Sequence, residues 1–327
     1  MIRKQDVSSL LPKTNKKTII KYNEKMYPIK KNTEDNWLYY VFAGFKIHYY
    51  SLKNQEKKVN SLALIGSGNG VDAIGAHYIF KEANQVYLTD IDPETLPLAI
   101  KNVKKNKKPG SNVSINGFVG DVCQPLEQEN IKADMIYANL PNIPLWKNTQ
   151  TNGFGLSTFY TPREKIRVPS ILKKNLLELQ LHFLNSTKPC LNSGGNVIQV
   201  IGGRFPAKNF KILFDEAGFN QQQLCAGLKL QTETREVISG YSKAEKENNN
   251  EFIFYDYKNA VKSLNKGGET SLITGKKTDY LEKRLKDYSM TATQALKEHK
   301  KGMKIGHTCH VLKGSLKNKK QHKYGGN

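Results

Sequence analysis

The stretch LALIGSGNG at residues 62–70 decides the fold of this chain. A short apolar run ends in a glycine loop, and residues 71–81 then carry apolar side chains at helical spacing. Glycines at such a strand-to-helix turn let the backbone approach a ligand closely, and a helix N-terminus attracts negative charge. The spacing is GxGxG, because Val71 stands where the dinucleotide pattern GxGxxG has its third glycine. The loop therefore favours a nucleoside without a pyrophosphate.

Strand-like and helix-like segments alternate on the C-terminal side of this loop. Alternation of this kind predicts an α/β fold, a Rossmann-like doubly wound and mostly parallel sheet, with ligands bound beyond the C-terminal strand ends. A loop is expected at 139–168 and an antiparallel edge hairpin from 222–231 and 251–257. The other expected strands are 60–65, 85–90, 113–119, 133–138 and 196–201, and the other expected helices are 93–107, 169–184 and 207–217.

Two acidic residues stand at expected strand ends. Asp90 closes the second strand, 24 residues after Gly66, where a carboxylate can accept hydrogen bonds from both ribose hydroxyls. Asp121 and Val122 follow the third strand, where they can meet an adenine amino group and ring edge. The loop and these strand ends together predict a nucleoside site.

The charge of the chain is concentrated in its flanks. The 327 residues include 51 Lys and Arg against 29 Asp and Glu, a formal charge of +22. Residues 1–60 have 13 basic and 5 acidic side chains and residues 258–327 have 17 and 5, which leaves 21 and 19 for the middle. Since phosphate contacts dominate nucleic-acid binding, a nearly neutral middle does not indicate a nucleic-acid substrate. The basic ends are expected to act in solubility or weak attraction to polyanions.

The sequence also argues against a membrane span, a secretory signal and a zinc site. No apolar run approaches the roughly 20 residues that span a bilayer, and the polar start lacks the apolar stretch of a secretory signal, so we expect a cytoplasmic protein without membrane contact. The four cysteines, 123, 190, 225 and 309, stand singly and read as reduced thiols. The His307, Cys309 and His310 spacing matches no standard zinc pattern, and no metal is expected.

The segments LALIGSGNG, VYLTDIDP, GDV and DMIYANLPN resemble the four motifs of class I S-adenosylmethionine-dependent methyltransferases, over about residues 60–257. The resemblance implies S-adenosyl-L-methionine as the cofactor. One departure is Leu64, which stands where the family often has an acidic residue that binds the cofactor. The residues that the resemblance assigns to the cofactor are Gly66, Ser67, Gly68, Asn69, Gly70, Asp90, Ile91, Asp121, Val122 and Asn139.

The fourth motif bears on the acceptor. Asn139, Leu140 and Pro141 are the candidate catalytic residues, and with Asn142 they resemble the Asn-Pro-Pro-Tyr motif of enzymes that methylate planar amino or amide nitrogens. Here the second residue is Leu and the aromatic fourth residue is Asn. An adenine or amide plane therefore lacks the ring on which it would stack, which disfavours a flipped base or a glutamine side chain.

Segments outside these motifs resemble the methyltransferase domain of methionine S-methyltransferase, which makes S-methylmethionine. They extend the resemblance to roughly residues 34–290, and their order and spacing carry it more than any one of them. The segments are EDNW at 34–37, FAG at 42–44, IGGRFP at 201–206, FDEAGF at 214–219, LKLQ at 228–231, NEFIFY at 250–255 and KGG at 266–268.

Methylation of a thioether needs positioning more than acid–base chemistry. The sulfur has no proton to lose, so aligning the two reactants supplies up to roughly 7–11 kcal/mol of the barrier reduction. Trp37, Tyr39 and Tyr40 are candidates for an aromatic wall that favours a sulfonium, although aromatic residues also pack cores. Arg204 is the candidate for bidentate binding of an amino-acid carboxylate, with Asp35 or Asn139 for the ammonium. Arg163 and Arg167 are substrate clamps or plain loop charges.

Three functions stay open on the sequence. The first is S-methylation of free methionine, a small amino-acid substrate. The second is N-methylation of a protein amide or nucleic-acid amino group, with the basic ends holding RNA or ribosomes. The third is an inactive methyltransferase-like binding protein. We expect a lid-like extension at 1–58, a cofactor-binding core at 59–257, a helical extension at 258–301 and a disordered basic tail at 302–327.

Overall fold

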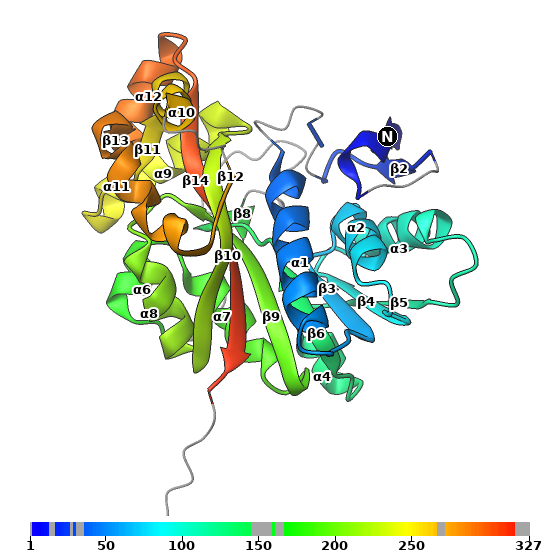
Figure 1. The fold of residues 1–327 in the computed structure, drawn as a ribbon. Helices are drawn as coiled ribbons and strands as arrows, with labels where there is room; N and C mark the ends of the chain where they lie inside the picture. The colour runs from blue at the N-terminus through cyan, green and yellow to red at the C-terminus, as the bar shows by residue number, and fades with distance from the viewer. Residues whose placement is uncertain are drawn as a thin grey trace, which may run out of the picture.

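The computed structural model describes residues 2–12, 17–26, 29–30, 36–144, 159–160, 167–266 and 272–317. Eight strands of its main sheet lie in the order β12-β10-β14-β9-β6-β3-β4-β5 (Figure 1). Their bounds are Leu272–Thr274, Phe219–Leu230, Ile305–Leu316, Leu191–Gly203, Ala133–Ala138, Ser61–Ile65, Gln85–Asp90 and Ser114–Val119. Neighbours from β9 to β5 are parallel, and β14 is antiparallel to both β9 and β10. The chain therefore has the Rossmann-like fold of class I methyltransferases, as predicted.

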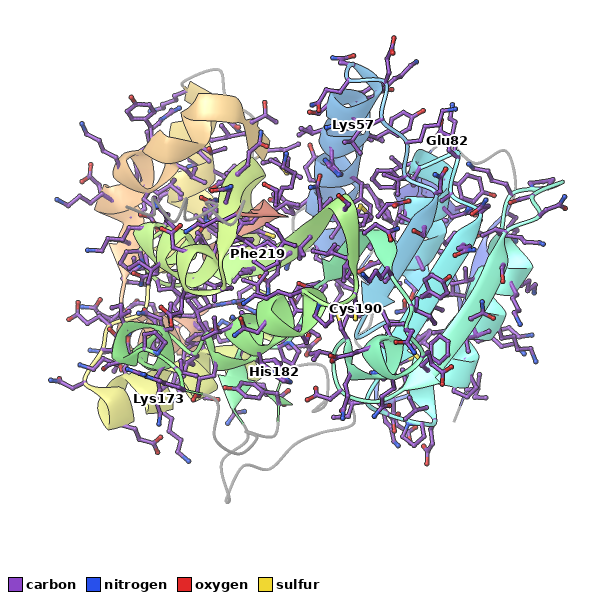
Figure 2. The ribbon with its side chains drawn as sticks, turned by 90° about the horizontal axis from the view of Figure 1, so that it is seen from below. Lys57, Glu82, Lys173, His182, Cys190 and Phe219 are labelled. Atoms are coloured by element: carbon purple, nitrogen blue, oxygen red, sulfur yellow. The ribbon has the colours of Figure 1, made fainter. Side chains whose placement is uncertain are left out.

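Helices cover both faces of the sheet. Apolar side chains of α1 (Trp37–Lys53), α2 (Val71–Ile79) and α3 (Thr95–Asn106) share one core cluster with the sheet. A second core cluster joins the opposite face of the sheet to α4 (Gln124–Gln128), α6 (Ser170–Lys174), α7 (Glu178–Thr187) and α8 (Lys208–Glu216). Figure 2 shows the sheet between Lys57, which follows α1 on one face, and His182, which lies on α7 on the other face. Every residue of β3 is buried, as a central strand covered on both faces requires.

Small residues let α1 lie close to its neighbours. A Cβ at Gly75 of α2 would overlap the ring of Phe42, and a Cβ at Gly44 would overlap Val311 of β14. The side chain of Asn36 caps α1 by accepting a hydrogen bond of 2.9 Å from Leu38 N. These contacts place Trp37, the first residue of α1, beside the glycine loop.

A short hairpin precedes α1. Strands β1 (Arg3–Asp6) and β2 (Ile19–Tyr22) are antiparallel, and the 3-10 turn η1 (Ser8–Leu10) follows β1. Two asparagines of α3 hold β2: Asn102 Nδ2 donates to Lys21 O at 2.7 Å, and Asn106 Nδ2 donates to Ile19 O at 3.1 Å. These hydrogen bonds fix the hairpin against α3, the helix that contacts Gly70 of the glycine loop.

The C-terminal part of the chain differs from the sequence expectation. Residues 222–230 lie in β10, whose antiparallel partners are β14 and β12. Among the described residues, β11 (Phe254–Asp256) pairs with the start of β14 and with β13 (Ser289–Met290) but not with β10. The expected hairpin of 222–231 with 251–257 is therefore wrong. The expected disorder over 302–327 is also wrong for β14, which inserts between β9 and β10; residues 318–327 lie outside the described ranges.

An insertion of about 70 residues separates β10 from β14 and forms the upper left of Figure 1. Its core joins α9 to α12, with Tyr241, Phe252 and Phe254 packed edge to face. The described helices of this insertion are α9 (Thr234–Asn248), α10 (Tyr257–Lys266), η3 (Gly275–Tyr280), α11 (Leu281–Leu285), η4 (Lys286–Tyr288) and α12 (Ala292–Lys300). Across the ranges described above, no helix combines the length and apolarity needed to cross a membrane.

Candidate functional site

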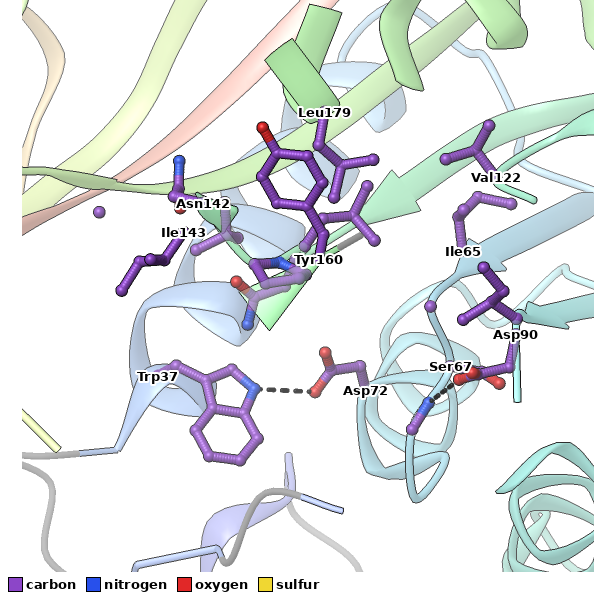
Figure 3. Close-up of a pocket in the computed structure, with 18 of the residues that line it drawn as sticks. Trp37, Ile65, Ser67, Asp72, Asp90, Val122, Asn142, Ile143, Tyr160 and Leu179 are labelled. Atoms are coloured by element: carbon purple, nitrogen blue, oxygen red, sulfur yellow. Dashed lines mark hydrogen bonds between the residues drawn. The ribbon is translucent and has the colours of Figure 1, made fainter. Parts of the chain in front are cut away.

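The glycine loop has the backbone geometry of a ligand cradle. Gly66, Gly68 and Gly70 have φ of 65°, 51° and 78°, a region that side-chain-bearing residues rarely adopt. Ser67 N donates to Thr89 O at 2.9 Å, and Gly68 N donates to a carboxylate oxygen of Asp90 at the same distance (Figure 3). The loop is thus tied to the end of the neighbouring strand β4.

Two backbone N–H groups fix the orientation of the Asp90 carboxylate at the cavity wall. One of its carboxylate oxygens accepts from Gly68 N and the other accepts from Asp92 N at 3.1 Å. Burial raises the pKa of Asp90, and these backbone donors oppose the rise. Asp92 itself pairs with Lys25 of the N-terminal segment, whose ammonium lies 3.3 Å from it.

Asp121 has a partner that the sequence did not indicate. His182 of α7 lies with Nε2 at 2.8 Å from Asp121 Oδ2. Both residues line the cavity, as does Val122, which has a φ of 37° after β5. A lone histidine in a helical segment carries no signal of such a contact, because 61 residues separate it from Asp121.

A single cavity of about 380 Å³ contains these residues and continues past them. All predicted cofactor residues line it except Gly70, which caps α2 and has no room for a Cβ next to Ala99 O and Val103. Asn139, Leu140 and Pro141 line it as well. Lining residues that sequence reasoning missed include Asp72, Tyr160, Glu178, His182, Lys229, Gln231, Tyr241 and His307.

Asp72, in the first turn of α2, also lines this cavity. Its carboxylate accepts hydrogen bonds from Trp37 Nε1 at 3.3 Å and from the Tyr137 hydroxyl at 2.7 Å. Burial raises its pKa from 3.8 to about 6, although both hydrogen bonds favour the charged form. Figure 3 shows Trp37 and Asp72 side by side below Asn142. Trp37 therefore belongs to the cavity wall.

A side chain of α7 donates hydrogen bonds to the backbone of the fourth motif. Gln180 Nε2 lies 3.2 Å from Pro141 O and 3.5 Å from Leu140 O, and its own Oε1 accepts from Gln199 Nε2 at 3.1 Å. The carbonyl of Pro141 thus already has a donor. Asn142, which stands in place of the family's aromatic residue, is buried and its Nδ2 has no hydrogen-bond partner among the described residues.

Arg204 lines the cavity and is buried, with 8% of its surface exposed. Its Nε and Nη2 both donate to Gln231 Oε1, at 3.1 and 2.6 Å, and Nη2 lies 3.1 Å from His307 Nε2. Its guanidinium carbon lies 5.1 Å from the centre of the Tyr241 ring. Gln231 therefore occupies the Nε–Nη2 edge of Arg204, so the bidentate carboxylate binding predicted for this residue is not open through that edge.

The other predicted acceptor residues lie elsewhere. Tyr40 is 1% exposed and donates its hydroxyl to Leu228 O at 2.8 Å, and Tyr39 faces outward on α1, so neither lines the cavity. The aromatic-wall prediction is wrong for these two tyrosines. Arg167 is exposed and does not line the cavity. Asp35 and Arg163 lie outside the described residues.

Comparison with known proteins agrees with this geometry. The model of the family "Ribosomal protein L11 methyltransferase (PrmA)" matches residues 47–147, less than half of the chain, from the end of α1 to the fourth motif. No curated protein matches the sequence.

Several solved structures have a related fold. A ribosomal protein L11 methylase from Lactobacillus delbrueckii subsp. bulgaricus is 20% identical, over 56% of this chain and 70% of that one, with a TM-score of 0.36. A precorrin-6y C5,15-methyltransferase from Geobacter metallireducens GS-15 is 9% identical, over 90% and 96%, with a TM-score of 0.40. A SAM-dependent methyltransferase from Agrobacterium tumefaciens is 11% identical, over 64% and 59%, with a TM-score of 0.39. These likenesses concern the fold alone.

The strand order, the glycine loop tied to Asp90 and the family match identify the site as an S-adenosyl-L-methionine site. The chain is a methyltransferase of the S-adenosylmethionine-dependent class. Neither the comparisons nor the contacts described so far select methionine as its acceptor.

Proposed function

We propose that this enzyme methylates a small acceptor held in the cavity beyond the fourth motif, and that free methionine, giving S-methylmethionine, is that acceptor. One observation carries the proposal: a single cavity is lined by the glycine loop, by Asp72 and by the buried polar residues around Arg204. A small molecule in that chamber would lie next to the cofactor-binding loop. A protein or nucleic-acid chain would have to thread its reacting group into the same space.

The cofactor supplies an electrophilic methyl group to the acceptor. On the protein side, Asp90 would hold the ribose through its carboxylate, and Asp121 would meet the adenine edge with His182 fixing its orientation. Asp72 and the face of Trp37 would favour a positively charged group between cofactor and acceptor. Asp72 would thereby supply a negative charge that Leu64, at the family's acidic position, does not.

The hydrogen bonds of the fourth motif support a sulfur acceptor. In an N-methyltransferase with this motif, carbonyl oxygens and the asparagine hold the amino group. Here Gln180 Nε2 already takes one of the two lone pairs of the Pro141 carbonyl, and the stacking ring is absent because residue 142 is Asn. A thioether needs neither, since it has no proton to transfer and reacts once it is aligned in line with the methyl group.

A second candidate function is methylation of a ribosomal protein or another macromolecule. The match of residues 47–147 to the ribosomal protein L11 methyltransferase family favours it, and so does the charge of +22. It predicts binding to ribosomes that weakens steeply with salt.

Transfer of a deuterated methyl group separates the two candidates. The full-length protein would be incubated with deuterium-labelled S-adenosylmethionine and, in separate reactions, with methionine, ribosomes and total RNA, followed by mass spectrometry. Labelled S-methylmethionine with unlabelled macromolecules supports the proposal. Label in a ribosomal protein or RNA and none in methionine replaces it with the second candidate.

A further inference from the structure

We propose that Arg204, Lys229, Tyr241 and His307 form a subsite that binds a carboxylate of the acceptor. This proposal rests on the proposed function, since it places the acceptor in the same cavity. All four residues line the cavity, and the sheet brings them together: Arg204 follows the end of β9, His307 lies on β14, and Lys229 pairs with His307 across β10 and β14.

Arg204 carries a buried positive charge that no described carboxylate neutralises. It forms no ion pair within the described residues, and its hydrogen-bond partners Gln231 and His307 are neutral groups. Burying a guanidinium without a counter-charge is costly, so such a residue indicates an anionic ligand. Its remaining nitrogen, Nη1, is not used by Gln231 or His307 and lies against Gly202, another lining residue.

His307 is kept neutral beside Arg204. Burial lowers the pKa of His307 well below its ordinary value, and the charges of Arg204 and Lys229 lower it further. Its Nε2 then accepts from Arg204 Nη2, which leaves the proton on Nδ1. The network therefore keeps the positive charge on Arg204 and Lys229.

Two buried polar groups of this wall have a proton with no acceptor among the described residues. Nδ1 of His307 makes no hydrogen bond there although the residue is only 4% exposed. The hydroxyl of Tyr241, in a residue 1% exposed, interacts with the guanidinium of Arg204, and its own proton is left for a ligand. Buried polar groups are almost always satisfied, so unpaired ones at a cavity wall point to a ligand that supplies the missing partners. Both can donate to an oxygen.

The number of donors favours a carboxylate over a phosphate. Gln231 Oε1 uses the Nε–Nη2 edge of Arg204, so one nitrogen of the guanidinium is left for a ligand. Lys229 Nζ already donates to Leu230 O at 2.9 Å, with Thr232 Oγ1 at 3.4 Å. Two cationic side chains, each partly used, suit a group of one negative charge and two oxygens.

Calorimetry with matched ligands tests the subsite. The full-length protein, saturated with S-adenosylhomocysteine, would be titrated with methionine, with methioninol, which lacks the carboxylate, and with inorganic phosphate. We expect methionine to bind at least about tenfold more tightly than methioninol, because a charge-assisted hydrogen bond is lost with the carboxylate. The variants Arg204→Gln and Lys229→Met should remove that preference while retaining S-adenosylhomocysteine binding.

The control variant is Arg235→Gln, which alters an exposed arginine on α9 outside the cavity and should leave every affinity unchanged. If Arg204→Gln melts early, Lys229→Met decides, since it keeps a long apolar stem. Equal binding of methionine and methioninol overturns the subsite, as does tighter binding of phosphate or failure of the wild-type protein to bind methionine. Methyl transfer to another acceptor in that last case would leave the methyltransferase activity standing and show that the subsite and the methionine assignment have failed.

Discussion

Gly202 leaves the space that the guanidinium of Arg204 occupies: a Cβ at position 202 would overlap Nη1. Gly202→Ala should therefore displace Arg204 from Gln231 and His307 without touching the glycine loop. We expect the KM for the acceptor to rise about tenfold, with the affinity for S-adenosylmethionine unchanged. Steady-state kinetics and calorimetry measure the two quantities, and an unchanged KM would show that the position of Arg204 is immaterial.

The raised pKa of Asp72 predicts a pH-dependent stability. Its folded pKa of about 6 exceeds the 3.8 of the unfolded chain, so the unfolded state binds fewer protons between these values. Asp72 thus lowers the free energy of unfolding as the pH rises from about 4 through about 6. The Asp72→Asn variant does not lose this free energy of unfolding as the pH rises. The difference in Tm between the variant and the wild type should therefore favour the variant more at pH 7.5 than at pH 4.5. Thermal melts across pH test it, and a Tm difference independent of pH would contradict the burial argument.

Asp90 is the residue on which we expect cofactor affinity to depend most. Its carboxylate accepts from Gly68 N and Asp92 N and would accept from the ribose. Asp90→Ala should weaken S-adenosylmethionine binding about tenfold to a hundredfold, because hydrogen bonds to charged groups contribute about 1.5–3 kcal/mol. Asp287→Asn, at an exposed position, is the matched control. Unaltered affinity in calorimetry of Asp90→Ala would remove this carboxylate from the site.

Two truncations test the role of β14. Removing residues 302–327 deletes a strand that pairs with β9 and β10 along most of its length, and we expect no folded protein. Removing residues 318–327 leaves that strand intact, and the Tm and cofactor affinity should stay close to those of the full chain. A folded, active protein after the larger truncation would show that the strand is dispensable.

The sequence predicted the cofactor half of the fold because its signals are local. A buried strand, a glycine loop and a helix follow one another within 61–79. Asp90 ends β4 and Asp121 follows β5 by two residues, and these two strands are parallel neighbours. Parallel strands bring their carboxyl ends to one edge of the sheet, so residues at those ends meet there.

The strand β14 could not be read from its sequence because polar residues interrupt its apolar pattern. Thr308 and His310 are buried, yet Thr308 Oγ1 donates to Gly203 O at 2.9 Å and His310 Nε2 lies 2.9 Å from Thr308 Oγ1. Such pairing exists only once the sheet has formed, and the high density of lysines nearby resembled a solvated tail.

The wall around Arg204 was missed for a related reason. It joins the end of β10 to the start of the antiparallel strand β14, residues that lie 78 positions apart at Lys229 and His307. No spacing rule relates them, because a helical insertion separates the two strands. Arg204 alone had a signal, at the end of a parallel strand.

Transfer of a deuterated methyl group from S-adenosylmethionine to methionine tests the central claim most directly. The account predicts that mass spectrometry finds S-methylmethionine carrying the label with the wild-type protein and much less with Asp90→Ala. A correctly folded wild-type protein that binds S-adenosylmethionine but leaves methionine unlabelled would contradict the assignment of methionine as acceptor. One that fails to bind S-adenosylmethionine at all would contradict the whole account.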